Sequence, residues 1–211
     1  MSTRPRFLIG YLNPPTVLTL GGVILASLSV YFSMNAARIP LTAICLMFAG
    51  ICDLFDGFVA RKCDLPPEER EYGIHIDTIA DMASFGVVPA IICMNLGLTS
   101  PIELAAIATY ICCAGTRLAY FNTIATQTSG PVPFFTGLPV TYAAILFPIV
   151  LYFCSTPGTP VQTLPLHVTL WVTSLLFILR IPIPKPKGLF YLLFPLLAGG
   201  LSYLFGQRLL G

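Results

Sequence analysis

The chain has 211 residues, of which 56% are hydrophobic and 9% are charged, with a formal net charge of +2 and a mean hydropathy of +0.85. A soluble globule needs more charge to cover its surface, so this composition indicates an integral membrane protein. The same figures exclude a disordered chain, which needs low hydrophobicity, and a nucleic-acid-binding protein, which needs clustered basic charge. The seven cysteines include no Cys-x-x-Cys pair, so we expect buried free thiols and no disulfide framework.

Apolar runs separated by proline-rich breakers predict the helices in chain order. Because about 20 apolar residues cross a bilayer, seven candidate spans lie near residues 16–34, 40–61, 74–96, 101–122, 137–155, 164–181 and 188–206. The last contains Gly199 and Gly200 and either breaks, forms a hairpin or continues, so the pattern supports six to eight transmembrane helices. We therefore predict an all-α integral membrane protein, a single helical bundle in one domain over residues 1–211.

Lysine and arginine are distributed unevenly between the two sides of the predicted bundle. With a cytoplasmic N-terminus, the cytoplasmic ends and loops hold Arg4, Arg6, Arg61, Lys62, Arg70, Arg117, Arg180, Lys185 and Lys187. The opposite side holds only Arg38 and Arg208. Cytoplasmic loops of membrane proteins are enriched in these residues, so we expect the N-terminus and the connection 62–72 to face the cytoplasm.

All five aspartates of the chain fall within one short window, and four of them lie in otherwise apolar helical sequence. Asp53 and Asp56 are spaced i, i+3, and Asp77 and Asp81 are spaced i, i+4, so each pair lines one face of its helix. The connection 62–72 is short enough to make the two helices antiparallel neighbours. We therefore expect the four carboxylates to converge near the cytoplasmic ends of these helices.

Four charged carboxylates in a membrane need positive charge nearby. One charged aspartate at a helix centre costs ~2.5–3.5 kcal/mol on insertion scales, so four approach about 10–14 kcal/mol. A bound divalent cation offsets this cost, and oxygen-only ligation points to Mg²⁺, Mn²⁺ or Ca²⁺ and not to zinc. The alternative, aspartates that cap helices or fringe a solvated loop, suits Asp64 but not the other four together. The mixed-charge run Glu68 to Glu71 is expected to be a solvated loop.

The stretch Asp53-Leu-Phe-Asp56-Gly57-Phe-Val-Ala60-Arg61, followed by Gly73-Ile-His-Ile-Asp77-Thr-Ile-Ala-Asp81, resembles the signature of the CDP-alcohol phosphotransferase family. That signature, D-x-x-D-G-x-x-A-R and then G-x-x-x-D-x-x-x-D, is matched over 53–81 at every specified position. The spacer between the two halves is eleven residues, longer than is usual in the family. The resemblance implies a membrane enzyme, commonly a homodimer, that transfers the phosphatidyl group of a CDP-linked lipid to an alcohol and releases CMP.

The resemblance also assigns roles by matching positions. The four aspartates of the signature would bind two divalent ions, Mg²⁺ or Mn²⁺, and Asp81 would also deprotonate the acceptor hydroxyl. The CDP-lipid site would be lined by Asp53, Gly57, Ala60, Arg61 and Gly73. These roles agree with the chemistry, because two metal ions about 3.5–4 Å apart hold a pyrophosphate, and arginine presents a planar cation suited to phosphate.

Three further segments resemble the bacterial and archaeal phosphatidylserine synthase branch of that family. They are Ser84 to Ala90, Ala114 to Asn122 and Phe135 to Pro139, and Tyr120 stands where the branch usually has arginine. The resemblance implies that serine is the acceptor and that Arg117 and Asn122, within 114–122, bind it, with 135–139 nearby. Serine also suits a lone arginine, which holds one carboxylate bidentately.

Several alternatives stay open at this point. Arg117 instead snorkels to the surface at a helix end, or Lys185 and Lys187 fold over the site and admit a phosphorylated acceptor. Other acceptors within the family, namely choline, glycerol phosphate and inositol phosphate, also stay open. From another class, intramembrane acids mark cation transporters, although here the carboxylates are confined to two neighbouring helices.

Overall fold

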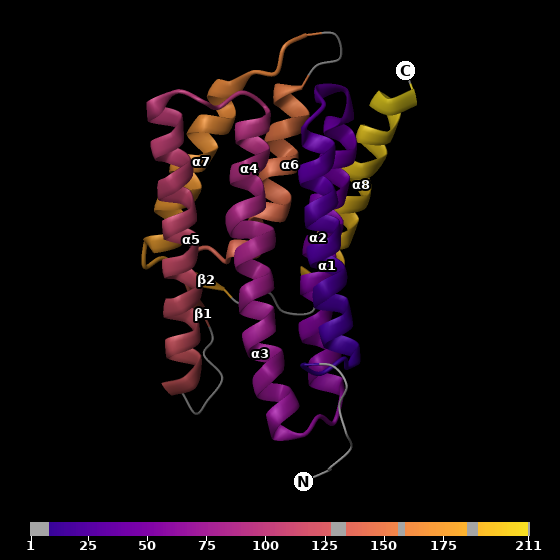
Figure 1. Ribbon diagram of the computed structural model, residues 1–211, viewed down its shortest axis with the longest axis vertical. Coiled ribbons are helices and arrows are strands. Elements are labelled where there is room, and N and C mark those ends of the chain that lie inside the picture. Colours follow the sequence, from indigo (N-terminus) through magenta and orange to yellow (C-terminus); the bar gives the residue numbers. More distant parts are fainter. Residues whose placement is uncertain (1–8, 128–133, 156–158, 185–189, 211) are drawn as a thin grey trace.

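The computed structural model describes residues 9–127, 134–155, 159–184 and 190–210. Within these ranges the chain is a bundle of helices aligned with the long axis of the molecule (Figure 1). The helices are α1 (Pro14–Ser33), α2 (Ile39–Lys62), α3 (Pro67–Asp81), α4 (Val88–Asn95), α5 (Pro101–Gln127), α6 (Ala143–Cys154), α7 (Thr163–Ile178) and α8 (Phe190–Leu210). Shorter elements are the turns η1 (Ala36–Arg38), η2 (Met82–Val87) and η3 (Val140–Tyr142) and the strands β1 (Phe134–Thr136) and β2 (Pro182–Pro184). The predicted all-α membrane bundle is confirmed.

The predicted spans correspond to helices of two lengths. Four segments are long and apolar enough to cross a membrane, namely Pro14–Ser33, Ala36–Lys62, Pro67–Asn95 and Pro101–Ile124. Two further apolar helices, Val140–Cys154 and Thr163–Ile178, are shorter. At 1.5 Å per residue, these two reach roughly 25 Å or less, below the ~30 Å of a hydrocarbon core. The last run forms one continuous helix, α8, through both of its adjacent glycines.

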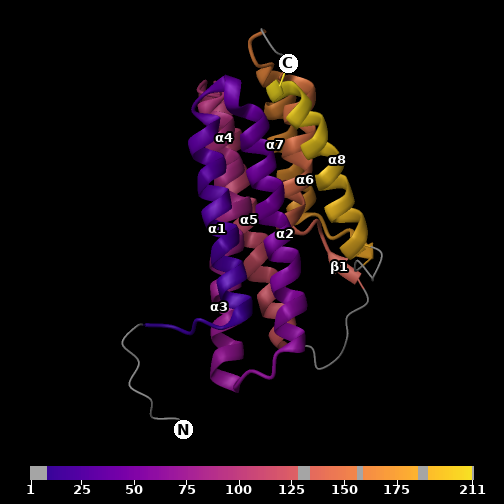
Figure 2. The ribbon, with the colours of Figure 1, turned by 90° about the vertical axis from the view of Figure 1, so that its right-hand side faces the viewer.

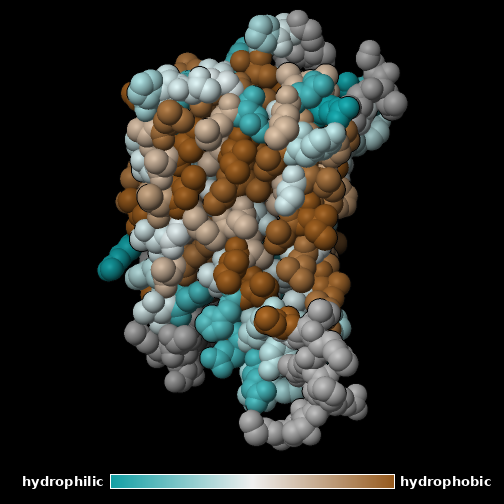
Figure 3. Space-filling model, in the orientation of Figure 1, coloured by the Kyte–Doolittle hydropathy of each residue, from teal (hydrophilic) through white to brown (hydrophobic). Residues whose placement is uncertain are grey.

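The outer surface is that of an integral membrane protein. Large apolar side chains are exposed along the bundle, including Ile24, Leu104, Val168 and Leu193. Figure 3 shows apolar side chains over the middle of one face and polar ones gathered toward its lower end. Lipid tails compensate this apolar exposure, which would be unfavourable in water.

The helices fall into two groups that differ in how far they extend toward the lower end of the bundle. Helix α1 packs along α2, which also contacts α6 and α8, and α5 contacts α7. Figure 2 shows α6, α7 and α8 grouped on one side of the bundle, while α2, α3 and α5 extend further toward the lower end. The lower ends of α6, α7 and α8 therefore lie near the middle of the bundle (Figure 2).

The expectation that Glu68 to Glu71 form a solvated loop is wrong, because α3 begins at Pro67. Proline is suited to the first turn of a helix, where its missing N–H costs nothing. Glu68 and Glu69 follow in that same turn, where the partial positive charge of the helix N-terminus favours carboxylates. The charged run therefore forms the N-terminal part of α3. It lengthens this helix by about two turns relative to the predicted span, which began near residue 74.

The helix from Pro67 to Asn95 changes geometry directly after Asp81, where η2 is a π-helical turn. Pro89, in the first turn of α4, has no N–H to donate to the Phe85 carbonyl one turn earlier. The Tyr110 hydroxyl of α5 donates to that carbonyl at 2.6 Å, and Tyr110 is fully buried. Short π-helical turns often occur at functional sites, and this one joins the aspartate helix to α5.

A small strand pair, not predicted from the sequence, positions η3. Strands β1 and β2 pair antiparallel, with Phe134 opposite Pro184. Gly137 follows with φ +78, and its N–H donates to the Ile181 carbonyl at 2.9 Å. A side chain there would meet the Phe177 carbonyl oxygen at 2.9 Å, so the position requires glycine. The chain then turns back toward α2 and α5.

Candidate functional site

The structure brings the four carboxylates of α2 and α3 together. Oxygens of Asp53, Asp56 and Asp77 lie within 4.8 Å of one another. Asp81 lies next to this group, with its carboxyl within hydrogen-bonding contact of Asp53. Helices α2 and α3 have little backbone contact with each other, so the carboxylates occupy the space between them.

Two threonine hydroxyls from outside the signature hold the carboxylates, and sequence reasoning missed both. Thr19 Oγ1, on α1, donates to Asp56 Oδ2, and the side chain of Asp56 is buried. Thr141, in η3, hydrogen-bonds the Asp53 carboxylate. The one signal available for α1 was the polar pair Thr16 and Thr19 in an otherwise apolar run. Nothing in the sequence placed Thr141 beside α2.

A cavity of ≈ 460 Å³ lies between the beginning of α1, the end of α2 and the beginning of α3. We call it the α1-side cavity. Its lining includes four of the five predicted CDP-lipid-site residues, Gly57, Ala60, Arg61 and Gly73. The fifth, Asp53, lines the cavity on the other side of the carboxylates. A side chain built at Gly73 would meet no atom within 4 Å, so this glycine leaves the cavity open beside the helix backbone.

A second cavity, of ≈ 300 Å³, lies on the other side of the carboxylates. We call it the α5-side cavity, because α5 contributes Arg117 to its lining, which also includes Asp53, Asp81 and Thr141. Four residues line both cavities, Asp56, Gly57, Arg61 and Asp77. The carboxylates thus stand at the boundary between two cavities, each of a size that admits small ligands.

Arg117 is tied to the segment that follows the strand pair. Its side chain is only 5% exposed, and its Nε donates to the Leu138 carbonyl at 3.2 Å. The guanidinium also lies over the Phe121 ring, 5.3 Å from its centroid. A snorkelling arginine would extend to the outer surface, whereas Arg117 is buried and lines the α5-side cavity. The side chains of Phe135 and Thr136 lie outside the described residues, as do Lys185 and Lys187.

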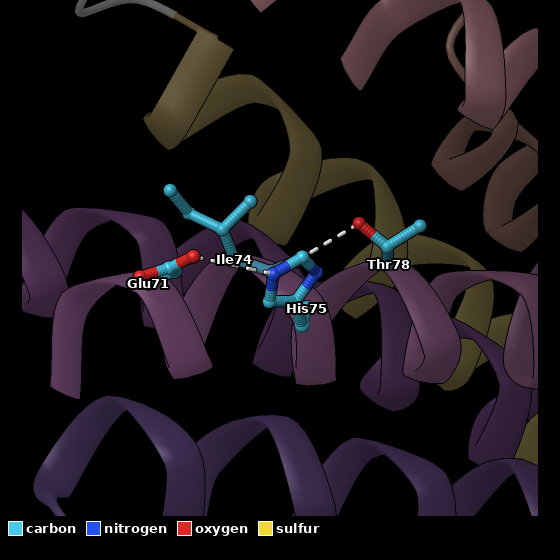
Figure 4. A network of polar contacts seen from close by, with 4 residues as sticks. All are labelled: Glu71, Ile74, His75 and Thr78. Atoms are coloured by element: carbon cyan, nitrogen blue, oxygen red, sulfur yellow. Dashed lines mark hydrogen bonds and ion pairs between the residues drawn. The ribbon is translucent and has the colours of Figure 1, made fainter. Parts of the chain in front are cut away.

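Asn122, the other residue predicted to contact the acceptor, lies against α3. Its Nδ2 donates to Thr78 Oγ1 at 2.8 Å, and it is not among the residues that line the two cavities. Figure 4 shows this outer face of α3, where His75 Nε2 lies 4.0 Å from Glu71 Oε1 and both side chains are largely exposed. The structure therefore places Asn122 at a contact between α5 and α3, beside the residue that follows Asp77.

The carboxylate group fits a divalent cation. Two oxygen ligands of one Mg²⁺ or Ca²⁺, bound at about 2.0–2.6 Å, lie at most about 4–5 Å apart. Oxygens of Asp53, Asp56 and Asp77 all lie within 4.8 Å of one another, which is within this limit for Ca²⁺ and close to it for Mg²⁺. All the donors are oxygen, which hard cations prefer, and the neighbouring threonine hydroxyls orient the carboxylates in the way that supports metal ligands.

Comparison with known proteins gives one family and several relatives. The family model described as CDP-alcohol phosphatidyltransferase matches residues 12–180. A CDP-diacylglycerol–serine O-phosphatidyltransferase of Mycobacterium leprae is 32% identical over 198 residues, covering 88% of this chain and 63% of that protein. Proteins of the same name from Helicobacter pylori (31% identical, 63% of this chain, 54% of that protein) and Bacillus subtilis (30%, 68%, 77%) are also similar.

The relatives extend beyond the part that this chain matches. The matched region spans less than two thirds of the Mycobacterium leprae protein and about half of the Helicobacter pylori protein. Within this chain, the family match begins just before α1 and ends just after α7. It therefore takes in the carboxylates, the whole lining of the α1-side cavity and all of the α5-side lining except Phe194.

Proposed function

Because the chain belongs to the CDP-alcohol phosphatidyltransferase family, we propose that it transfers the phosphatidyl group of CDP-diacylglycerol to L-serine, giving phosphatidylserine and CMP. The observation that carries this proposal is the pair of cavities that meet at the carboxylates. In an in-line displacement the leaving group and the attacking alcohol lie on opposite sides of the reacting phosphorus, and two cavities on either side of the carboxylates support such an arrangement. The names of the relatives support serine as the acceptor.

In this proposal the α1-side cavity holds the CDP part of the donor. Gly57 and Gly73 let the nucleotide approach the helix backbones, and Arg61 pairs with the phosphates. Arg61 and Asp77 line both cavities, so a pyrophosphate beside them reaches the boundary. The bond to be broken then lies next to the α5-side cavity.

The α5-side cavity holds the serine. Arg117 binds the serine carboxylate, while Asp81 accepts the proton of the serine hydroxyl. The serine oxygen forms a bond to the phosphorus of the phosphatidyl group, the pyrophosphate bond breaks, and CMP leaves with the bridging oxygen. Asp81 lies beside the cluster Asp53, Asp56 and Asp77 and not within it, which suits the group that must release and accept protons.

We assign two divalent ions, Mg²⁺ or Mn²⁺, to Asp53, Asp56, Asp77 and Asp81. When bound, such ions neutralise the carboxylates and the pyrophosphate and stabilise charge on the attacking and leaving oxygens. The protein's own contribution is to orient the carboxylates through Thr19 and Thr141.

The proposed site faces the cytoplasm, and the proposed assembly is a homodimer. Arg61 and Lys62 at the end of α2 and Arg70 in the first turns of α3 lie at the end of the bundle that carries the α2–α3 connection. Arg38, just before α2, and Arg208, near the end of α8, lie toward the other end (Figure 1). This asymmetry supports a cytoplasmic site. Cysteine labelling of intact cells and light scattering of the purified protein test the two assignments separately.

One experiment tests the activity. The purified full chain in detergent is incubated with CDP-diacylglycerol, Mn²⁺ or Mg²⁺, and serine, choline, glycerol phosphate or inositol phosphate in parallel, and products are identified by mass. We expect phosphatidylserine and CMP in equal amounts with serine alone. A product with another alcohol would reassign the acceptor, and metal flux through vesicles without CMP release would point to a cation transporter.

A further inference from the structure

One face of α3 follows the α1-side cavity from the carboxylates to its outer end. Glu69, Gly73 and Asp77 recur every four residues and all line this cavity, which is the spacing of one helix face. Each step along this face advances about 6 Å, so Glu69 lies roughly 12 Å from Asp77 along the axis. That length accommodates a nucleoside monophosphate, with its phosphate beside Asp77, its ribose over Gly73 and its base at Glu69.

Glu69 is held in position from α1. Asn13 Nδ2 donates to Glu69 Oε2 at 3.2 Å. The other end of the Asn13 amide is also occupied, because its Oδ1 accepts from the Thr16 N–H at 3.1 Å and from Thr16 Oγ1 at 2.7 Å. Asn13 is itself only 7% exposed. The Glu69 carboxylate is therefore anchored at the cavity wall by a buried amide.

The residues next to Glu69 differ from it in position. Glu68 is exposed and accepts from the Tyr11 hydroxyl at 3.3 Å. Glu71 is 78% exposed on the outer face of α3, beside His75 (Figure 4). Of the three glutamates in this charged run, only Glu69 lines the α1-side cavity.

From this arrangement we propose that Glu69 selects the base of the nucleotide by accepting a hydrogen bond from the 4-amino group of cytosine. An ionised carboxylate only accepts hydrogen bonds, and its two oxygens offer about four acceptor positions, so one carboxylate can serve several donors at once. Cytosine presents an amino donor at this position, and carboxylates are its usual partner, whereas uracil presents an oxygen that the carboxylate would repel. This inference rests on the proposed function, which places CDP in the α1-side cavity.

The test measures nucleotide binding without turnover. Binding of CDP and of UDP to the full chain in detergent with Mg²⁺ is measured by calorimetry, and we expect the wild type to prefer CDP. In Glu69→Gln we expect the dissociation constant for CDP to rise about 10- to 100-fold, as for loss of a hydrogen bond to a charged group. The amide can turn its NH₂ toward the base and donate to the uracil oxygen, so UDP binding should hold or strengthen. Glu71→Gln, on the outer face, should keep the wild-type preference.

Several outcomes would overturn the assignment. An unchanged ratio of CDP to UDP affinity in Glu69→Gln removes Glu69 from base selection. If that variant instead weakens serine or ethanolamine binding, the carboxylate binds a primary amine. A wild type that binds neither nucleotide overturns the proposed function itself, which separates the two failures. Glu69→Asp, which keeps the charge on a shorter side chain, should bind CDP more tightly than Glu69→Gln does, and its thermal melting checks that the fold is intact.

Discussion

The two cavities that meet at the carboxylates are built in different ways. The α1-side cavity is lined by residues close together in the sequence, from the end of α2 to the middle of α3, with a contribution from the beginning of α1. The α5-side cavity draws on α2, α3, α5, η3 and α8, which come together only in the folded chain. In the proposed function, the nucleotide side is therefore encoded mainly by one continuous stretch, whereas the acceptor side is assembled from distant segments.

Asp56 and Asp77 line both cavities, so removing the metal that the carboxylates hold should abolish both functions. We expect EDTA to reduce turnover to background, because four neighbouring carboxylates and a pyrophosphate repel one another without intervening positive charge. Added Mn²⁺ or Mg²⁺ should restore activity. Phosphatidylserine formation from labelled serine measures the effect, and full activity in excess EDTA would contradict the metal assignment.

Asp81 lines the α5-side cavity and is not among the residues that line the α1-side cavity. Replacing it should therefore impair the reaction of the acceptor while leaving the binding of CDP-diacylglycerol intact. Asp81→Asn keeps the shape and an oxygen but removes the ability to accept a proton, and we expect kcat to fall ~10²–10⁴-fold. Calorimetry should still detect CDP-diacylglycerol binding. If Asp81→Asn loses that binding as completely as Asp53→Asn does, then Asp81 is chiefly a metal ligand and another group takes the proton.

Replacing Arg117 should weaken the binding of the acceptor and leave the binding of CDP-diacylglycerol nearly unchanged. In Arg117→Ala we expect the KM for serine to rise about 10- to 100-fold, from the loss of hydrogen bonds to a charged carboxylate, with little change in the KM for CDP-diacylglycerol. Arg117→Lys keeps the charge and should recover part of the loss. Because Arg117 also bonds the Leu138 carbonyl, thermal melting accompanies the kinetics. Equal losses for both substrates would indicate a role in the fold.

The smallest effects are expected at Thr19 and Thr141, which hold the carboxylates from the two sides. Thr19→Val removes the hydrogen bond to Asp56 from the α1 side, and Thr141→Val removes the one to Asp53 from the α5 side. Each change keeps the side-chain shape, and we expect the Mn²⁺ concentration for half-maximal activity to rise about 10-fold, as for other groups that orient metal ligands. Thr109→Val, whose hydroxyl bonds only its own helix, is the control. No shift in either variant would show that the carboxylates are held without these hydroxyls.

The membrane class and most helices could be predicted because apolar composition and proline breakers act locally. The start of α3 was mistaken for a loop, since its charge run looked solvated although Pro67, Glu68 and Glu69 suit the first turn of a helix. The strand pair could not be predicted, because three-residue strands carry too little pattern and their pairing joins segments far apart in the chain.

The same distinction, between features set by local sequence and features set by contacts of distant segments, applies to the candidate site. The convergence of the four aspartates could be predicted from the sequence, because fixed spacings on two helices joined by a short connection leave few ways to arrange them. The resemblance to the family signature named four further residues of the α1-side cavity, Gly57, Ala60, Arg61 and Gly73. The contacts of Thr19 and Thr141 with those aspartates, and of Asn122 with Thr78, became visible only in the folded chain. Their positions depend on how α1, α5 and η3 pack against α2 and α3, and packing between distant segments is set by the combined shape of many side chains rather than by any local pattern.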